Sequence, residues 1–153
     1  MYVTVRRILK GLVVTLAVLV GLFGLMQLVP YGRTHSNPPT IKEPAWDSPR
    51  TRELAVRACF DCHSNETRWP WYASVAPMSW IVEYDIANGR SLINFSEWNV
   101  PYTVAEFSSL SVRTGGMPPT KYRLAHPEAQ LTAQELEDLA RGLDTTLKTT
   151  GTH

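Results

Sequence analysis

The short segment Cys59-Phe60-Asp61-Cys62-His63 constrains the chain more than any other part of its sequence. It holds both cysteines of the 153-residue chain, separated by two residues, and a histidine directly follows the second. This spacing is typical of a c-type haem attachment site, in which both thiols bond the haem and the adjacent histidine ligates the iron. The predicted cofactor is therefore one haem c, covalently attached through Cys59 and Cys62, with His63 as a metal ligand.

Other uses of two neighbouring cysteines fit the sequence less well. A structural zinc site needs two further ligands at suitable spacing, and the sequence offers no second Cys/His pair. A thioredoxin-like redox pair is expected beside a strand–helix unit of an α/β chain, and this sequence has no such pattern. A redox dithiol or a structural disulfide between Cys59 and Cys62 remains the alternative to haem.

The N-terminal region predicts a membrane anchor. Residues 11–29 are almost all apolar, and Thr15 and Gln27 are the polar exceptions. At about 1.5 Å per residue, a helix of this length spans roughly 28 Å, close to the ~30 Å of a bilayer core. A cleaved signal peptide is the alternative, but it usually has a shorter apolar region and an A-x-A-like site, which is absent before Pro30. Residues 1–30 are therefore predicted to be an uncleaved signal-anchor.

Charged residues predict the orientation of this anchor. Arg6, Arg7 and Lys10 precede the apolar stretch, which favours a cytoplasmic N-terminus and an exported C-terminal part. Covalent haem attachment in bacteria takes place outside the cytoplasmic membrane, so the topology agrees with the haem prediction. Apart from these three residues, 12 of the 15 basic residues remain against 14 acidic ones, which argues against nucleic-acid binding. The predicted location is the bacterial inner (cytoplasmic) membrane, crossed once, with the C-terminal domain facing the periplasm.

The composition divides the rest of the chain into a tether and a domain. Residues 31–46 are rich in Pro, Asn, Ser and Thr and have no apolar period, which predicts an extended tether. Residues 47–150 follow as a single predicted haem-binding c-type cytochrome domain of about 100 residues.

Helix signals recur through this domain, and no stretch alternates as a strand does. Ser48 followed by Pro49 predicts a helix start ahead of the cysteine motif. A second helix is expected over 77–89 and a third over 103–113. The positions of the second helix that are expected to face inward are Trp80, Ile81, Tyr84 and Ile86. The domain is therefore predicted to be all-α, a small cytochrome c-like helical domain around one haem, preceded by the transmembrane helix.

The last helix has the clearest start signal. Thr132 and Glu135 form a capping box, and Leu131 with Leu136 flanks it as a hydrophobic staple. The apolar residues that follow share one helical stripe: Leu136, Leu139, Ala140, Leu143 and Leu147. The pattern predicts an amphipathic helix that packs on the domain.

A second iron ligand is expected in the loop over residues 115–119, Gly-Gly-Met-Pro-Pro. Glycines allow a close approach of the backbone and prolines fix the loop, while the segment has no helical face for a core methionine. Met117 is therefore the predicted distal metal ligand. The alternative distal ligands are Met78, at a helix start, and His126, ahead of the last helix; His35 lies in the tether.

Several motifs accompany these ligands, namely Cys59–Trp80, Gly89-Arg90, Asn94–Trp98, Met117–Pro119, and His126-Pro127 with Leu131-Thr132. In these motifs, which cover the exported domain, the chain resembles a bacterial family of haem-binding-domain proteins, single-haem c-type cytochromes with an N-terminal anchor. The resemblance implies covalent haem through Cys59 and Cys62, His63 as the proximal ligand, and the methionine-proline loop on the distal side. The chain departs from the family at Asp85, where many members have a histidine, and this departure favours a methionine ligand.

These features predict an electron carrier: a periplasm-facing, membrane-anchored monohaem c-type cytochrome with His/Met axial ligation, which raises the reduction potential. The alternative is a haem-based sensor or gas-binding module with a displaceable distal ligand. A peroxidase-type enzyme is less favoured, because no acid/base constellation is evident beside the ligands. The protein is therefore expected not to be an enzyme, and to exchange electrons with a redox protein partner that the sequence does not identify.

Overall fold

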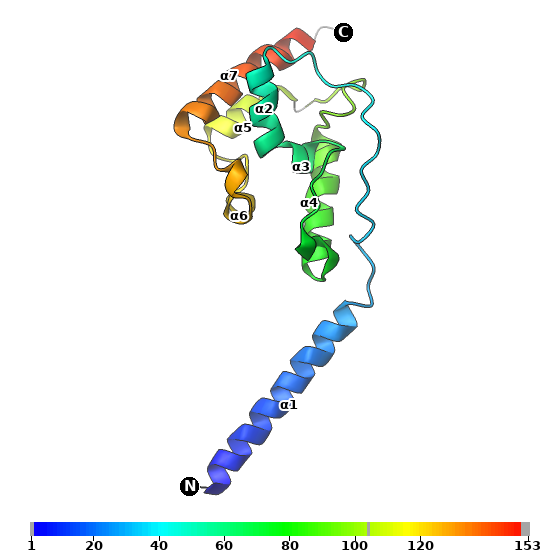
Figure 1. The fold of residues 1–153 in the computed structure, drawn as a ribbon, viewed down its shortest axis with the longest axis vertical. Helices are drawn as coiled ribbons and strands as arrows, with labels where there is room; N and C mark the ends of the chain where they lie inside the picture. Colours follow the sequence, from blue (N-terminus) through cyan, green and yellow to red (C-terminus); the bar gives the residue numbers. More distant parts are fainter. Residues whose placement is uncertain (1, 104, 151–153) are drawn as a thin grey trace. The chain divides into compact units, whose positions relative to one another are not determined.

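The computed structural model describes residues 2–103 and 105–150 of the chain. These residues form helices and loops, and one isolated bridge, between Lys42 and Glu97, is the strand-like pairing found among them. The prediction of an all-α fold with an N-terminal apolar helix is therefore confirmed. The elements, which can be followed in Figure 1, are α1 (Tyr2–Met26), α2 (Pro49–Ala58), α3 (Phe60–His63), η1 (Trp71–Ser74), α4 (Met78–Leu92), η2 (Ala105–Phe107), α5 (Ser108–Arg113), α6 (Thr120–Ala125), η3 (Pro127–Ala129) and α7 (Ala133–Thr150).

The chain divides into two compact units. The first comprises Met1–His35 and Pro70–Tyr84, and the second comprises Ser36–Trp69 and Asp85–His153. In the first unit, α1 is long and apolar enough over Val5–Met26 to cross a membrane, and it is not buried against protein. The chain after α1 is hydrogen-bonded to the segment that contains η1.

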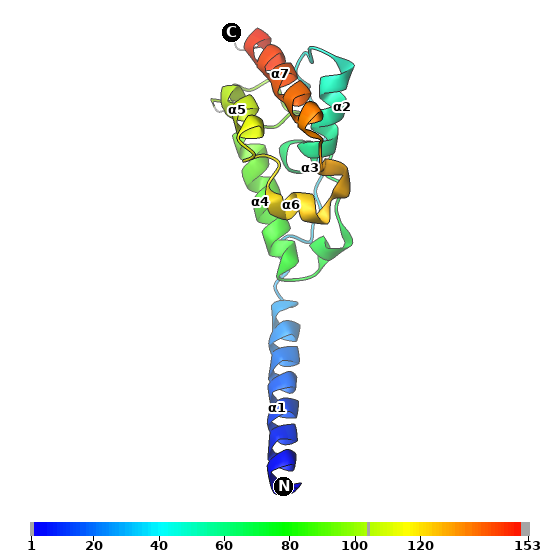
Figure 2. The same cartoon turned by 90° about the vertical axis from the view of Figure 1, so that its left-hand side faces the viewer.

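The core of the second unit lies where α2 and α5 pack against α7 (Figure 2). Its buried apolar residues are Leu54, Ala55, Ala58, Phe60, Ile93, Phe95, Val112, Leu139, Ala140, Leu143 and Leu147. Leu136 is partly buried against them, so the apolar stripe predicted for the last helix is confirmed. Gly142 lets α7 come close to α2, because a Cβ at this position would clash with the side chain of Thr51.

The helix starts predicted from capping residues, at Ser48 and at Thr132, are both confirmed. The Ser48 side chain accepts a hydrogen bond from the Thr51 amide at 3.2 Å, and Pro49 is the first residue of α2. At α7, the Glu135 amide donates to Thr132 Oγ1 at 3.2 Å, and the Thr132 amide donates to Glu135 Oε2 at 2.9 Å. This reciprocal pair is the capping box expected from the sequence.

The middle of the chain differs from the prediction. α4 continues to Leu92 instead of ending at Gly89, because this glycine is used for close packing inside the helix (see below). Ile86 is buried as expected, whereas Ile81 and Tyr84 are exposed and not inward-facing. The helix expected over 103–113 is divided into η2 and α5, and Val104 lies outside the described residues.

Residues 36–46 contain no helix, but they are hydrogen-bonded to the rest of the second unit. The Ile41 amide donates to Ser96 O at 2.8 Å, and the Trp98 amide donates to Lys42 O at 2.8 Å. The ring of Trp46 lies 5.2 Å from that of Phe95, centroid to centroid. This part of the predicted tether therefore packs as part of the folded unit, which its polar composition did not indicate.

Candidate haem site

The cysteine motif lies at the junction of two helices. α2 ends at Ala58, Cys59 is the single residue between α2 and α3, and α3 carries Cys62 and His63. The amides of Cys62 and His63 donate to Cys59 O at 3.2 and 2.9 Å. Both cysteines are free thiols. The local helical turn thus fixes two sulfurs and an imidazole within five consecutive residues.

The thiols are in a desolvated environment. Desolvation raises the pKa of Cys59 to about 12 and that of Cys62 to about 11, and the carboxylates of Asp85 and Asp61 contribute further to the rise at Cys62. A reactive redox dithiol instead requires a readily formed thiolate. The desolvated thiols therefore argue against the redox-dithiol alternative.

The His63 ring is held through Nδ1, which lies 3.0 Å from Gly89 O and 3.2 Å from Ile93 O. Because a carbonyl oxygen can only accept, Nδ1 must carry the proton, and Nε2 retains its lone pair. Desolvation lowers the pKa of His63, which favours the same neutral form. A neutral imidazole with Nδ1–H on a backbone carbonyl is the form in which histidine binds metals through Nε2.

Gly89 allows α4 to lie against the cysteine motif. A Cβ at this position would clash with the carbonyl oxygen of Cys62. The same residue supplies one of the two carbonyls that accept from His63. The sequence pattern predicted Gly89 as the end of a helix and indicated neither its contact with Cys62 nor its hydrogen bond with His63. The signal that could have revealed it is a glycine within a helical pattern, which costs about 1 kcal/mol relative to alanine and so usually has a packing reason.

Arg90, the next residue of α4, fastens the loop after the motif. Its Nε donates to Ser64 O at 2.8 Å, and its Nη2 donates to Thr67 Oγ1 at 3.0 Å and to Asn37 Oδ1 at 3.2 Å. Together, Gly89 and Arg90 let one helix hold both the histidine and the loop that follows it.

Asp61, inside the motif, is a buried carboxylate surrounded by donors. It accepts from the Arg68 amide at 3.0 Å and from the Tyr122 hydroxyl at 2.6 Å, and it pairs with the Arg68 guanidinium. Burial, together with the bond to Asp61, raises the pKa of Tyr122, so the phenol remains a donor. Tyr122 belongs to α6, and the neighbouring Lys121 Nζ lies 2.7 Å from the carboxylate of Asp85 on α4. α6 is thus bound to both the cysteine motif and α4 through polar contacts that the sequence did not predict.

Met117 lies in the loop between α5 and α6, as expected from the sequence. Its amide donates to Ser111 O at 3.0 Å, and the residue is 37% exposed. Gly115 adopts a φ of +74°, a conformation that favours glycine, whereas a Cβ on Gly116 would meet nothing closer than 3.5 Å. The loop therefore needs its first glycine for the backbone turn. Because α6 begins at Thr120, the Met117 loop leads directly to the helix that contacts the cysteine motif.

His126 has other partners in the second unit. Its ring stacks on Tyr122 with a centroid separation of 4.2 Å, and its Nδ1 lies 3.3 Å from Glu128 Oε1. Ligand atoms of Asp61, His126 and Glu128 lie within 4.8 Å of one another. The Arg68 guanidinium already pairs with both carboxylates, at 3.3 and 3.5 Å, and supplies the positive charge that a metal ion would bring.

Two other residues considered as distal iron ligands lie in the first unit. Met78 is the first residue of α4, and His35 Nε2 lies 3.1 Å from Ala73 O. The second unit contains all of the principal predicted ligands, and α3 with its preceding residue brings three of them together: Cys59, Cys62 and His63.

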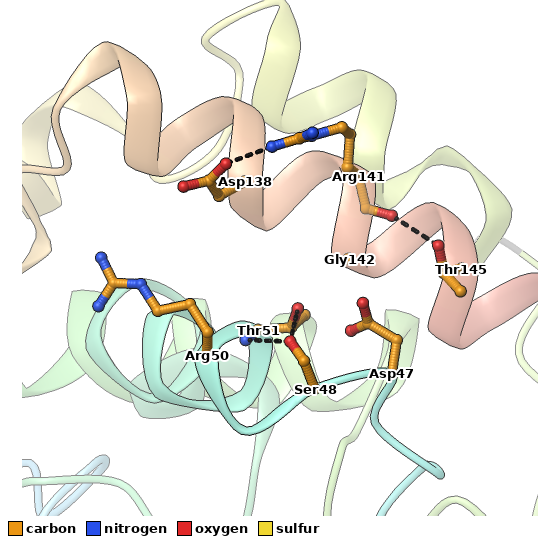
Figure 3. Close-up of a pocket in the computed structure, with 8 residues that line it drawn as sticks. All are labelled: Asp47, Ser48, Arg50, Thr51, Asp138, Arg141, Gly142 and Thr145. Atoms are coloured by element: carbon orange, nitrogen blue, oxygen red, sulfur yellow. Dashed lines mark hydrogen bonds and ion pairs between the residues drawn. The ribbon is translucent and has the colours of Figure 1, made fainter.

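A pocket of about 410 Å³ is present in the second unit between the start of α2 and α7 (Figure 3). It is lined by Asp47, Ser48, Arg50, Thr51, Asp138, Arg141, Gly142 and Thr145. The lining contains no thiol, thioether or imidazole. On the α7 side of the pocket, Arg141 forms an ion pair with Asp138. This pocket therefore contributes none of the predicted haem ligands.

The residues of the second unit fit a covalently bound haem. Two free thiols and a neutral histidine with an available Nε2 match the donor set that a haem c requires. On α6, Arg123 Nε is buried and has no hydrogen-bond partner among the described residues, so it is a donor suited to a carboxylate such as a haem propionate. α6 itself contains no buried residue, so it presents side chains that a large apolar cofactor could cover.

Comparison with known proteins agrees with this chemistry. No curated protein and no solved structure matches the chain. The model of a family described as the haem-binding domain matches residues 21–145, which include the cysteine motif, Met117 and His126. The match extends over most of the sequence, and the chain therefore belongs to the haem-binding domain family.

Proposed function

We propose that the protein is a membrane-anchored, periplasm-facing monohaem c-type cytochrome that carries single electrons. Cys59 and Cys62 would attach the haem covalently, and His63 and Met117 would be the axial ligands of the iron. The observation that carries the proposal is the protonation and hydrogen bonding of the His63 ring. Its Nδ1–H donates to two backbone carbonyls, which leaves Nε2 as the ligand atom beside two free thiols.

The surrounding residues would orient and tune this site. When bound, the haem iron supplies one-electron redox chemistry. The hydrogen bonds from His63 to the Gly89 and Ile93 carbonyls fix the ring orientation and make Nε2 more basic. Met117 would add a neutral, soft thioether, which favours ferrous iron and raises the potential. The bond between Tyr122 and Asp61 ties the helix that follows Met117 to the cysteine motif.

Helix α1 would anchor the protein in the membrane. Its length and apolar composition suit a single span, and Arg6, Arg7 and Lys10 near its start favour a cytoplasmic N-terminus. The haem-binding unit would then face the periplasm, the compartment in which bacteria attach haem covalently.

Covalent attachment is tested by expressing the full chain together with the haem-maturation machinery and staining denaturing gels for haem peroxidase activity. The wild-type band should keep its stain. Cys59→Ala and Cys62→Ala should each weaken it, and the double variant should lose it. A wild-type protein that loses its haem on denaturation would contradict the c-type assignment.

Axial ligation is tested by visible spectra of both redox states. The ferric wild type should show the weak long-wavelength band that methionine–iron ligation gives. Met117→Ala should lose this band, become high-spin or water-ligated, bind CO rapidly when reduced, and have a lower midpoint potential. Met78→Ala is the matched control and should leave the spectrum unchanged. Rapid CO binding by the wild type would instead favour the sensor function.

A further inference from the structure

The end of α1 is hydrogen-bonded to the segment that carries Trp71. Gln27 directly follows α1, and its Nε2 donates to Ala76 O at 2.9 Å. Its Oε1 accepts from the Ala76 amide at 3.0 Å and from Arg33 Nη2 at 2.9 Å. One side chain at the end of the apolar helix therefore satisfies both backbone groups of a residue 49 positions away.

Two more contacts join the chain after α1 to the same segment. His35 Nε2 lies 3.1 Å from the carbonyl oxygen of Ala73, a buried residue of η1. Gly32, at a φ of +76°, lies so close to the start of α4 that a Cβ would clash with the carbonyl oxygen of Ser79. Residues 73–79, from η1 to the start of α4, are thus held at three points by the residues that immediately follow α1.

Trp71 is exposed, whereas Ala73 of the same short helix is buried. Trp71 is 82% exposed, and its described ring contact is an edge-on arrangement with Tyr72 at 5.8 Å. Other large apolar side chains are exposed on the chain that follows α1, namely Leu28, Val29 and Tyr31. A single exposed leucine is ordinary, but several exposed apolar residues on two segments that are hydrogen-bonded at the end of an apolar helix indicate an interaction surface.

We propose that Trp71 inserts into the interfacial layer of the lipid bilayer that α1 crosses, so that η1 forms a second membrane contact beside the span. Gln27 directly follows α1, close to the end of the apolar stretch at Val29, and its bonds to Ala76 connect the segment that contains η1 to that position. An indole suits this layer because its ring is apolar while its N–H needs a polar partner. The inference rests on the proposed membrane anchor and adds a lipid surface as the partner of the first unit.

Photocrosslinking in the full-length, haem-loaded protein tests this contact. Trp71→p-benzoylphenylalanine is reconstituted in vesicles of phosphatidylethanolamine and phosphatidylglycerol, irradiated, and analysed for lipid adducts by mass spectrometry. The same substitution at Leu22, within α1, is the positive control. Leu110, on α5, is 55% exposed and controls for exposure alone. We expect lipid adducts at positions 71 and 22 and none at position 110.

The outcomes separate this inference from the proposed anchor. Adducts at position 22 without adducts at position 71 would overturn the inference and leave the anchor intact, whereas no adduct at position 22 would contradict the anchor. Adducts from position 71 to a second copy of the chain in place of lipid would also overturn it. Gln27→Ala should lower the yield at position 71 but not at position 22; an unchanged yield at position 71 would overturn the role of Gln27.

Discussion

Gly89 is the residue on which the close approach of α4 to Cys62 depends. Gly89→Ala places a methyl group against the Cys62 carbonyl, and overpacking of this kind costs roughly 1–3 kcal/mol. We expect a lower free energy of unfolding in urea and a perturbed His63 environment in the haem spectrum. Gly116→Ala is the matched control, since a Cβ there meets nothing nearer than 3.5 Å. Equal effects of the two substitutions would contradict this account.

Tyr122 contributes through its hydroxyl. Tyr122→Phe keeps the ring that stacks on His126 but removes the 2.6 Å hydrogen bond to the buried Asp61 carboxylate. A hydrogen bond to a charged group contributes roughly 1.5–3 kcal/mol, so we expect a loss of that order in equilibrium unfolding. Tyr84→Phe removes a hydroxyl from an exposed tyrosine and should change stability by less than about 0.5 kcal/mol. If Tyr122→Phe left the free energy of unfolding unchanged, the Asp61 carboxylate would be satisfied by Arg68 alone.

The residues of the site differ in how far the sequence could reveal them. Cys59, Cys62 and His63 are adjacent, so a local spacing rule was sufficient to predict the thiols and the imidazole as a group. Gly89 acts on His63 across 26 residues, and Tyr122 reaches Asp61 across 61 residues. Pairings at such separations depend on the packing of helices and leave no periodic signal in one sequence.

At the scale of elements, α7 depends on its capping box. The hydrogen bond from the Thr132 amide, followed by the bond from Arg57, lowers the pKa of Glu135 from 4.5 to about 2. Because the folded-state pKa is the lower one, this stabilisation is present above pH 4.5 and is lost as the pH falls toward 2. The difference in unfolding free energy between the wild type and Glu135→Gln should therefore shrink over this range in denaturant titrations. A difference that stays constant with pH would contradict the prediction.

Helix starts were easier to predict than helix ends. Ser48 and Thr132 satisfy free backbone amides with their own side chains, so the signal lies within three residues of the start. The end of α4 was predicted wrongly because Asn88-Gly89 is a common stop signal. Here the close contact with Cys62 accounts for the glycine, and the helix continues to Leu92. The contacts of Ile41 and Lys42 were missed because they use backbone groups, which every residue carries.

At the scale of the whole molecule, the first unit depends on residues that a cleaved signal peptide would remove. Gln27 follows the span of α1 directly and bonds both backbone groups of Ala76. Cleavage near Tyr31 would delete Gln27 and leave these groups without it. The structure of this unit therefore gives a reason, independent of the missing A-x-A-like site, to expect that α1 is retained.

We accordingly expect the mature protein to contain α1 and to stay in the membrane fraction after high-salt washing, with an intact mass that includes residues before Gln27. Protease added outside spheroplasts should degrade the haem-stained domain, because Arg6, Arg7 and Lys10 favour a cytoplasmic N-terminus. Gln27→Ala is a control that separates membrane anchoring from the Gln27–Ala76 contact. It should leave the protein in the membrane, because the apolar span is unchanged. It should also lower the stability of the segment around Ala76. A soluble protein whose N-terminus lies near Tyr31 would contradict the anchor, because a chain cut there keeps neither the span nor the Gln27 side chain that joins it to the first unit.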